Sequence, residues 1–297
     1  MLLLTLLSLT AWAADIDALW DYEQPVVSEK RFRELDERAG REQDAALQAE
    51  ARTQIARALG LQGRVAEGNQ VLDALQPTLG ELPPVISVRY LLERGRLIGS
   101  GGDPKKSWRW YRNALLLAQR NGLDFHAVDA MQMLANGETG KAALDWNLKA
   151  IALAERSTQP HAGDWLGSLY NNLGWVYRDQ RDLPKALEYL RKAQAWQETH
   201  GGGKRLLIAR WSVAKLLRES GEHEKALTVQ LDLERAWNKL GEEDGYVYEE
   251  IAENQYALGR VDVARSYFRR ALQLLSRDEW LVRNEAARIA RLRQLAQ

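Results

Sequence analysis

Apolar residues recur at spacings of three and four positions along most of the chain, which is the period of an amphipathic helix. The run Ala186, Leu190, Ala193 and Trp196 is one example. The strict alternation of apolar and polar residues that indicates strands is nearly absent. Glycines such as Gly241 fall where these helices would end. The pattern therefore predicts an all-α protein.

The helical pattern also repeats along the chain, and internal repeats of this length are typical of stacked helical units. Four segments align without gaps on a central alanine, which is Ala143, Ala186, Ala226 or Ala264. A further amphipathic segment and a turn precede each of these alanines, so one repeat consists of two helices. The repeat starts that follow from this alignment are Ala49, Val88, Asp124, Gly167, Leu207 and Gly245.

These units resemble the tetratricopeptide repeat, a helix–turn–helix unit of about 34 residues. The family pattern L-G-x-x-Y followed by A-x-x-x-F-x-x-A is matched by Leu173, Gly174, Tyr177, Ala186, Leu190 and Ala193. The repeat starts are instead 36 to 43 residues apart, and the terminal proline of the family is missing in this register. The resemblance implies an all-α, right-handed superhelical solenoid of antiparallel helix pairs.

The family's eighth and twentieth positions carry small residues because two helices cross closely there. The eighth position is small in five of six repeats, with Met131 as the exception, and the twentieth is small in all six. On this basis we expect about six repeats over residues 49–276. We expect an N-terminal segment and capping helix over 15–48 and a C-terminal capping helix over 277–297.

The first fourteen residues are expected to be a secretory signal segment. They carry no charged side chain, they end near the small-residue pattern Ala11-Trp12-Ala13, and they are too short to span a bilayer. This predicts a periplasmic or secreted protein whose mature chain has no stable membrane insertion. The alternative is a cytoplasmic protein in which this segment is buried.

Composition excludes several kinds of chemistry. The chain has no cysteine, so disulfides, thiolate metal sites and a cysteine nucleophile are ruled out. Lys and Arg total 41 and equal the 41 Asp and Glu, whereas a nucleic-acid-binding protein normally carries a basic excess. The four histidines do not have metal-ligand spacing. We therefore expect no metal, no cofactor and no nucleic acid partner.

An enzymatic role remains a minor alternative because the chain has eleven tryptophans. All-helical glycosidases combine many tryptophans with two carboxylates about 5–10 Å apart. However, tryptophans such as Trp110, Trp146 and Trp196 fall on packing helices of the repeats, where an aromatic side chain fills the core. The sequence also contains no motif that identifies a nucleophile or an acid–base pair. The chain is therefore predicted not to be an enzyme. The acidic candidates for the alternative are Glu249, Glu250 and Glu253.

The first helix of each repeat is the expected binding surface, because in the resembling family its inner face lines a groove for peptides or partner proteins. The sixth position of this helix is polar in all six repeats. An asparagine amide both donates and accepts hydrogen bonds, and aromatic residues are frequent binding anchors. A solenoid also needs a solvated inner face, so polarity alone does not prove binding. The candidate residues are Gln54, Arg57, Glu93, Arg96, Asp129, Gln132, Asn171, Asn172, Trp175, Trp211, Lys215, Glu250 and Glu253.

Charge is unevenly distributed over two neighbouring first helices. Residues 201–218 carry five basic residues and no acid, and residues 240–259 carry six acids and no base. The favoured interpretation is pairing between neighbouring helices, such as Lys215 with Glu253. The alternative is a bipolar groove that fixes the direction of a ligand.

Taken together, the sequence predicts a non-catalytic adaptor or scaffold that holds a protein or peptide in its groove. An intracellular, peptide-sensing regulatory protein is the main alternative. The identity of the partner and the oligomeric state are left open by the sequence.

Overall fold

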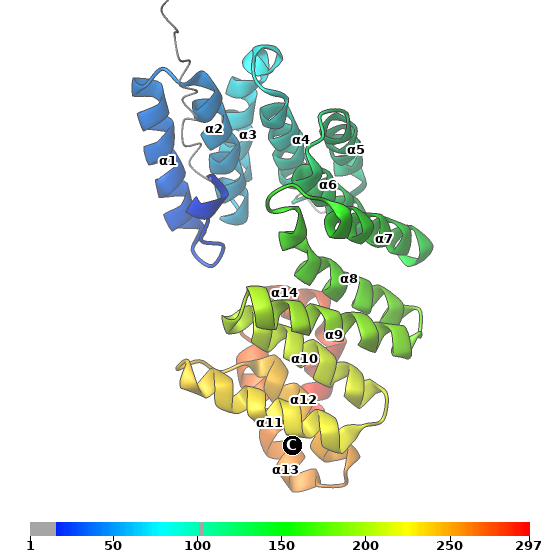
Figure 1. Cartoon of the computed structure of the whole chain (residues 1–297). Helices are drawn as coiled ribbons and strands as arrows, with labels where there is room; N and C mark the ends of the chain where they lie inside the picture. Colours follow the sequence, from blue (N-terminus) through cyan, green and yellow to red (C-terminus); the bar gives the residue numbers. More distant parts are fainter. Residues whose placement is uncertain (1–15, 101–103) are drawn as a thin grey trace, which may run out of the picture. The chain divides into compact units, whose positions relative to one another are not determined.

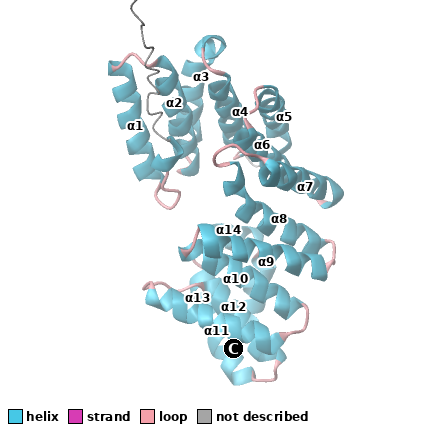
Figure 2. Ribbon diagram, in the orientation of Figure 1, coloured by secondary structure: helices cyan, strands magenta, loops and turns pink. Residues whose placement is uncertain are grey.

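The computed structural model describes residues 16–100 and 104–297, and all regular structure in these ranges is helical (Figure 1, Figure 2). This confirms the all-α prediction. The expected signal segment, residues 1–14, lies outside the described residues. The chain divides into two compact units. The N-terminal unit runs to Gly137 and includes Thr158–Ala162, and the C-terminal unit comprises Glu138–Ser157 and Gly163–Gln297.

The N-terminal unit is built from six α-helices whose sequence neighbours pack against each other. Helix α2 also packs against α4, so successive first helices lie side by side. Short 3-10 helices, η1 (Ile16–Leu19) and η2 (Gln76–Glu81), precede α1 and α4. The α-helices are α1 (Pro25–Arg41), α2 (Ala45–Leu61), α3 (Val65–Leu75), α4 (Pro84–Gly99), α5 (Pro104–Arg120) and α6 (Asp124–Asn136).

The C-terminal unit contains the remaining α-helices, again packed in sequence order. A third 3-10 helix, η3 (Ala162–Trp165), leads into α8. The third expected repeat is divided, since α6 belongs to the N-terminal unit and α7 to the C-terminal unit. The helices are α7 (Gly140–Arg156), α8 (Leu166–Asp179), α9 (Leu183–His200), α10 (Gly203–Glu219), α11 (His223–Lys239), α12 (Gly245–Ala257), α13 (Val261–Leu275), α14 (Glu279–Asn284) and α15 (Ala286–Leu295).

Small residues at the crossing positions allow the helices of a pair to approach closely. A Cβ atom added to Gly174 of α8 would lie 2.6 Å from Leu190 Cδ2 and 3.3 Å from the carbonyl oxygen of Ala186, both in α9. Real Cβ contacts are longer, so a side chain at Gly174 would push these two helices apart. The central alanines Ala143, Ala186, Ala226 and Ala264 are buried, as the repeat pattern requires.

The N-terminal segment before α1 is fixed to the first helices by an aromatic contact. Trp20 Nε1 donates a hydrogen bond to Gln54 Oε1 at 3.0 Å, and its ring packs edge-on against Phe32. Phe32 and Leu35 of α1 are buried, whereas Val27 is only half-buried. This segment therefore completes the core at the start of the repeats.

The C-terminal residues expected to form one capping helix form two, α14 and α15, with Glu285 between them. Leu281, Ile289 and Leu292 are buried and α15 packs against α13, so the segment covers the last repeat. Ala286, the first residue of α15, is exposed. Within residues 16–100 and 104–297, no helix combines the length and the apolar character needed to cross a bilayer.

Candidate binding surface

The candidate residues lie on the first helices of the repeats, but in two separate sets. The N-terminal unit carries the candidates of α2, α4 and α6, and the C-terminal unit carries those of α8, α10 and α12. Their burial differs from the solvated stripe that the sequence suggested. The most deeply buried candidates are Gln54, Glu93, Asp129 and Glu250, each at most 3% exposed.

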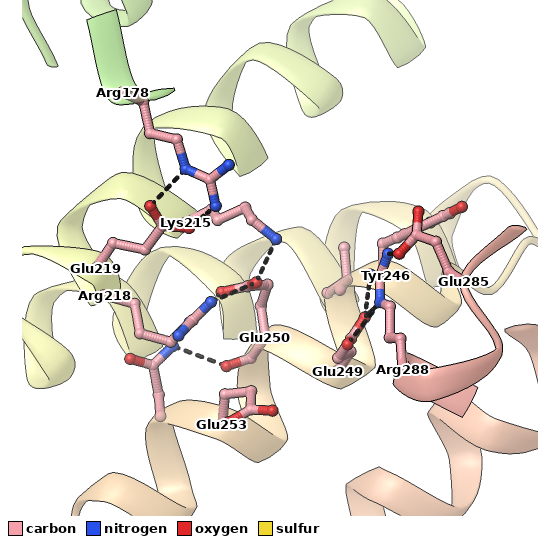
Figure 3. Close-up of polar contacts among 12 residues, drawn as sticks. Arg178, Lys215, Arg218, Glu219, Tyr246, Glu249, Glu250, Glu253, Glu285 and Arg288 are labelled. Carbon is pink, nitrogen blue, oxygen red and sulfur yellow. Dashed lines mark hydrogen bonds and ion pairs between the residues drawn. The ribbon is translucent and has the colours of Figure 1, made fainter. Parts of the chain in front are cut away.

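In the C-terminal unit, ion pairs join the three first helices α8, α10 and α12 (Figure 3). Arg178 of α8 donates from Nε and from a terminal nitrogen to Glu219 of α10, both at 2.8 Å. Lys215 Nζ and Arg218 Nε of α10 donate to Glu250 of α12 at 3.1 Å and 2.6 Å. Opposite charges on neighbouring helices thus pair with each other, as the favoured interpretation of the charge pattern expected.

The pairing partner of Lys215 is Glu250, and the sequence-based choice of Glu253 was wrong. Glu253 instead accepts a hydrogen bond from Arg291 of α15 at 3.0 Å. Arg288 of α15 donates to Glu249 of α12 at 2.9 Å (Figure 3). Arg288 and Arg291 therefore attach α15 to α12.

These contacts bear on the glycosidase alternative. Glu249, Glu250 and Glu253 all accept hydrogen bonds from arginine or lysine side chains. Each of these carboxylates is thus engaged by a basic side chain of another helix, whereas a glycosidase needs two carboxylates that face the sugar across a cleft. The geometry of these three residues favours a structural role over catalysis.

Aromatic rings from the same three helices form a row. The ring centroids of Trp175 and Trp211 are 6.2 Å apart, and those of Trp211 and Tyr246 are 6.1 Å apart. All three side chains are half-buried, so they are accessible in part. Arg178 lies 5.7 Å from the Trp175 ring centroid and Lys215 4.9 Å from that of Trp211, at cation–π distance.

The asparagines beside Trp175 differ in their surroundings. Asn171 accepts a hydrogen bond from Ser212 Oγ of α10 at 3.3 Å, so it helps to join the first helices. Asn172 is half-buried and lies three positions before Trp175, on the same face of α8. An apolar cavity of about 370 Å³ adjoins the row and is lined by Ile208, Trp211 and Tyr246 among others.

Sequence reasoning did not identify Tyr246 or Arg178 as part of this surface. Both lie on first helices, but neither occupies the fifth, sixth or ninth position of its repeat, where all the candidates lie. Scanning these helices for aromatic and basic residues on the same face would have found them.

In the N-terminal unit the polar candidates belong to a buried ionic network. Arg96 of α4 donates to Glu93 of the same helix and to Asp129 of α6, both at 2.5 Å. Arg89 lies one turn before Glu93 and pairs with Asp17 at 2.7 Å and with Glu50 of α2 at 2.9 Å. This network links the N-terminal segment with α2, α4 and α6.

Burial perturbs the titration of several members of the network. Desolvation raises the pKa of Glu93 and lowers the pKa of His126 in α6 to about 4, so this histidine is neutral at pH 7. Burial also raises the pKa of Tyr111 to about 12. Burial alone would raise the pKa of Asp17, but its hydrogen bond with Arg89 and the positive charges of Arg89 and Arg57 together outweigh that effect and lower it. Sequence reasoning missed Asp17 and His126, because neither lies at a chosen repeat position.

A cavity of about 380 Å³ lies beside this network, within the size range of small-ligand sites. Its wall includes Arg57, Glu93 and Arg96 from the candidate set. The other candidates of this unit, Gln54, Asp129 and Gln132, are not part of the wall. Leu61, Leu97 and Met133 supply apolar surface, and Tyr111 of α5 closes one side.

Comparisons with known proteins place the fold. Residues 165–239 match the family model of the tetratricopeptide repeat. None of the curated protein sequences matches this chain significantly. The crystal structure of NprR in complex with its cognate peptide NprX is 16% identical with a TM-score of 0.56, and the alignment covers 94% of this chain and 82% of that chain. The crystal structure of the apo form of RapI is 9% identical with a TM-score of 0.66, covering 89% and 77%.

At these identities the two structures bear on architecture alone. The family-model match falls on α8 to α11 and their flanking residues, which is where the sequence pattern of the repeat was strongest. The resemblance stated from the sequence is thereby confirmed, and the chain has the fold of a helical repeat solenoid.

Proposed function

We propose that this tetratricopeptide-like repeat protein is a non-catalytic adaptor or scaffold that holds a protein or peptide against its first helices. The proposed surface has two separate parts: the candidates of α2, α4 and α6 in the N-terminal unit, and those of α8, α10 and α12 in the C-terminal unit together with Tyr246 and Arg178. In this role the ion pairs hold the helices in register, and the partly accessible aromatic and amide groups contact the partner.

The observation that carries this proposal is the aromatic row of the C-terminal unit. Trp175, Trp211 and Tyr246 come from three successive first helices and are half-buried, and Asn172 lies on the same face of α8 as Trp175. Tryptophan and tyrosine are the residues that most often dominate binding energies, because they bury large apolar areas with few rotatable bonds. The NprR structure, which is similar in fold, contains a cognate peptide and so supports a peptide or protein as the partner class.

The double substitution Asn172→Ala with Trp175→Ala is expected to weaken partner binding at least about tenfold, as truncation of a central aromatic anchor usually does. The partner is first obtained by affinity capture on the purified protein at near-native salt and identified. Its dissociation constant is then measured for the wild type and the variant by titration calorimetry.

A matched control is the pair Trp280→Ala with Asn284→Ala in α14. These residues have the same chemistry but lie outside the proposed contact surface, and Trp280 is 63% exposed. The control should bind like the wild type. Unchanged binding by the Asn172 and Trp175 variant would contradict the assignment of the surface.

We further propose that the protein is exported and acts in the periplasm or outside the cell. The support is the uncharged, apolar segment at residues 1–14. N-terminal sequencing of the mature protein is expected to begin after Ala13 or Ala14. An intact Met1 would instead favour the alternative, an intracellular peptide-sensing regulator.

A further inference from the structure

We propose that the cavity of the N-terminal unit receives the guanidinium or ammonium group of a basic side chain in a bound peptide, with Glu93 as its acceptor. This inference rests on the proposed binding function and names the chemistry that one part of the surface recognises. Three features of the cavity support it.

The first feature is an unused carboxylate oxygen. Glu93 is 2% exposed and forms part of the cavity wall. Its Oε1 atom accepts a hydrogen bond from Arg96 at 2.5 Å and lies 3.7 Å from Arg57. Its Oε2 atom is buried, and no donor among the described residues reaches it. A buried acceptor without a partner is costly. Because Glu93 forms part of the cavity wall, a small rotation of its side chain would bring Oε2 to a donor in the cavity and supply the missing hydrogen bond.

The second feature is the charge balance of the network. Arg89 lies between the carboxylates of Asp17 and Glu50. Arg96 lies between those of Glu93 and Asp129. Arg57 is the remaining cation of the network, and its guanidinium lies over the rings of Trp20 and Tyr22. His126 is neutral at pH 7 because burial lowers its pKa to about 4. When all four carboxylates are ionised, they exceed the three arginines by one negative charge.

Arg57 and Arg96 both approach Oε1, and no donor among the described residues forms a hydrogen bond with Oε2. A guanidinium or ammonium group at Oε2 would restore the balance of charge and form a charge-assisted hydrogen bond.

The third feature is the setting of the cavity. Helices α2, α4 and α6 contribute their last residues to its wall, including Leu61, Gly99 and Asn136. The C-terminal end of a helix carries a partial negative charge that favours a cation. Leu61 is 53% exposed, and together with Leu97 and Met133 it offers apolar contact to the stem of a long side chain and to apolar neighbours in a peptide.

Two matched probes test the proposal on the intact wild-type protein: acetyl-Leu-Arg-Leu-amide and the same peptide with citrulline, which has nearly the same shape but no charge. Affinities are measured by titration calorimetry at pH 7.5. We expect the arginine peptide to bind at least about tenfold more tightly than the citrulline peptide, as the loss of a charge-assisted hydrogen bond would predict. We also expect it to bind more tightly than free argininamide.

The substitution Glu93→Gln should remove the difference in affinity between the two peptides, because it replaces the charged carboxylate with a neutral amide. Glu67→Gln, which alters a surface pair with Arg64 in the same unit, should leave the difference intact. Circular dichroism of each variant confirms that it is folded, and the wild-type comparison of the two peptides does not depend on any variant.

Equal binding of the two peptides, or no binding of either, would overturn the proposal. If Glu93→Gln still bound the arginine peptide more tightly than the citrulline peptide, Glu93 would not be the acceptor. If argininamide bound as tightly as the arginine peptide, the cavity would recognise a free cation and not a peptide side chain. These outcomes are separate from the Asn172 and Trp175 experiment, which tests the binding function on the C-terminal unit.

Discussion

Replacing Glu250 with leucine is expected to lower the free energy of unfolding by about 3 kcal/mol. Glu250 is 1% exposed and accepts hydrogen bonds from Lys215 and Arg218. Its removal leaves two cations without their acceptor between α10 and α12. The expected loss is at the lower end of the range for a broken buried ion pair, because the side chains of Lys215 and Arg218 keep 17% and 22% of their surface exposed and can turn toward water.

The measurement is urea unfolding at pH 7 followed by circular dichroism. Glu188→Leu serves as the control, since Glu188 pairs with Lys192 on the exposed side of α9 and both side chains are about half-exposed. An exposed pair of this kind is worth about 0.5 kcal/mol or less. A loss for Glu250→Leu as small as that of the control would show that the link between α10 and α12 contributes little to stability.

The fold could be predicted from the sequence because it depends on features that are local in the chain. Helical periodicity and small residues at fixed offsets, such as Gly174 and Ala186, specify both the helix pair and its close crossing. The capping of the last repeat was also predicted, but its division into two helices was not. Glu285 has backbone angles outside the helical range, and no proline or glycine marks that position.

Ion-pair partners were harder to predict, because they depend on the register between neighbouring helices. Glu250 and Glu253 lie one helical turn apart on the same face of α12, so a small change in how α10 packs decides which of them meets Lys215. That register is set by the length and conformation of the connecting helix α11 and its turns, which the repeat pattern does not specify.

The buried network of the N-terminal unit was missed for a different reason. Asp17 and Arg89 are 72 residues apart in sequence, and Asp17 belongs to a segment that precedes the repeats. The pattern identified Glu93 and Asp129 as polar positions but could not show that an N-terminal segment and the partner helices bury them. The same burial leaves the Oε2 atom of Glu93 without a hydrogen-bond donor among the described residues.

Replacing Arg96 with methionine is expected to lower the free energy of unfolding at pH 7.5 by about 3–5 kcal/mol. Arg96 bridges Glu93 and Asp129, which are 2% and 3% exposed, and methionine keeps a long apolar stem but supplies no donor. Two carboxylates would then remain in the interior without their main cation. Arg96→Lys, which keeps the charge but loses the planar, two-sided donor geometry, should give an intermediate loss.

The loss should also become smaller as the pH falls from 7.5 to 5. Burial already holds the pKa of Glu93 above its ordinary value, and removing Arg96 takes away its nearest cation, so the folded variant binds more protons than its unfolded form in this range. The stability of the Arg96→Met variant therefore rises relative to that of the wild type as the pH is lowered. Urea titrations of wild type and variant at several pH values measure the gap. If the difference in free energy of unfolding between wild type and variant were constant over this pH range, the carboxylates would remain paired without Arg96, through Arg57 or solvent. The network would then be less tightly buried than its geometry indicates.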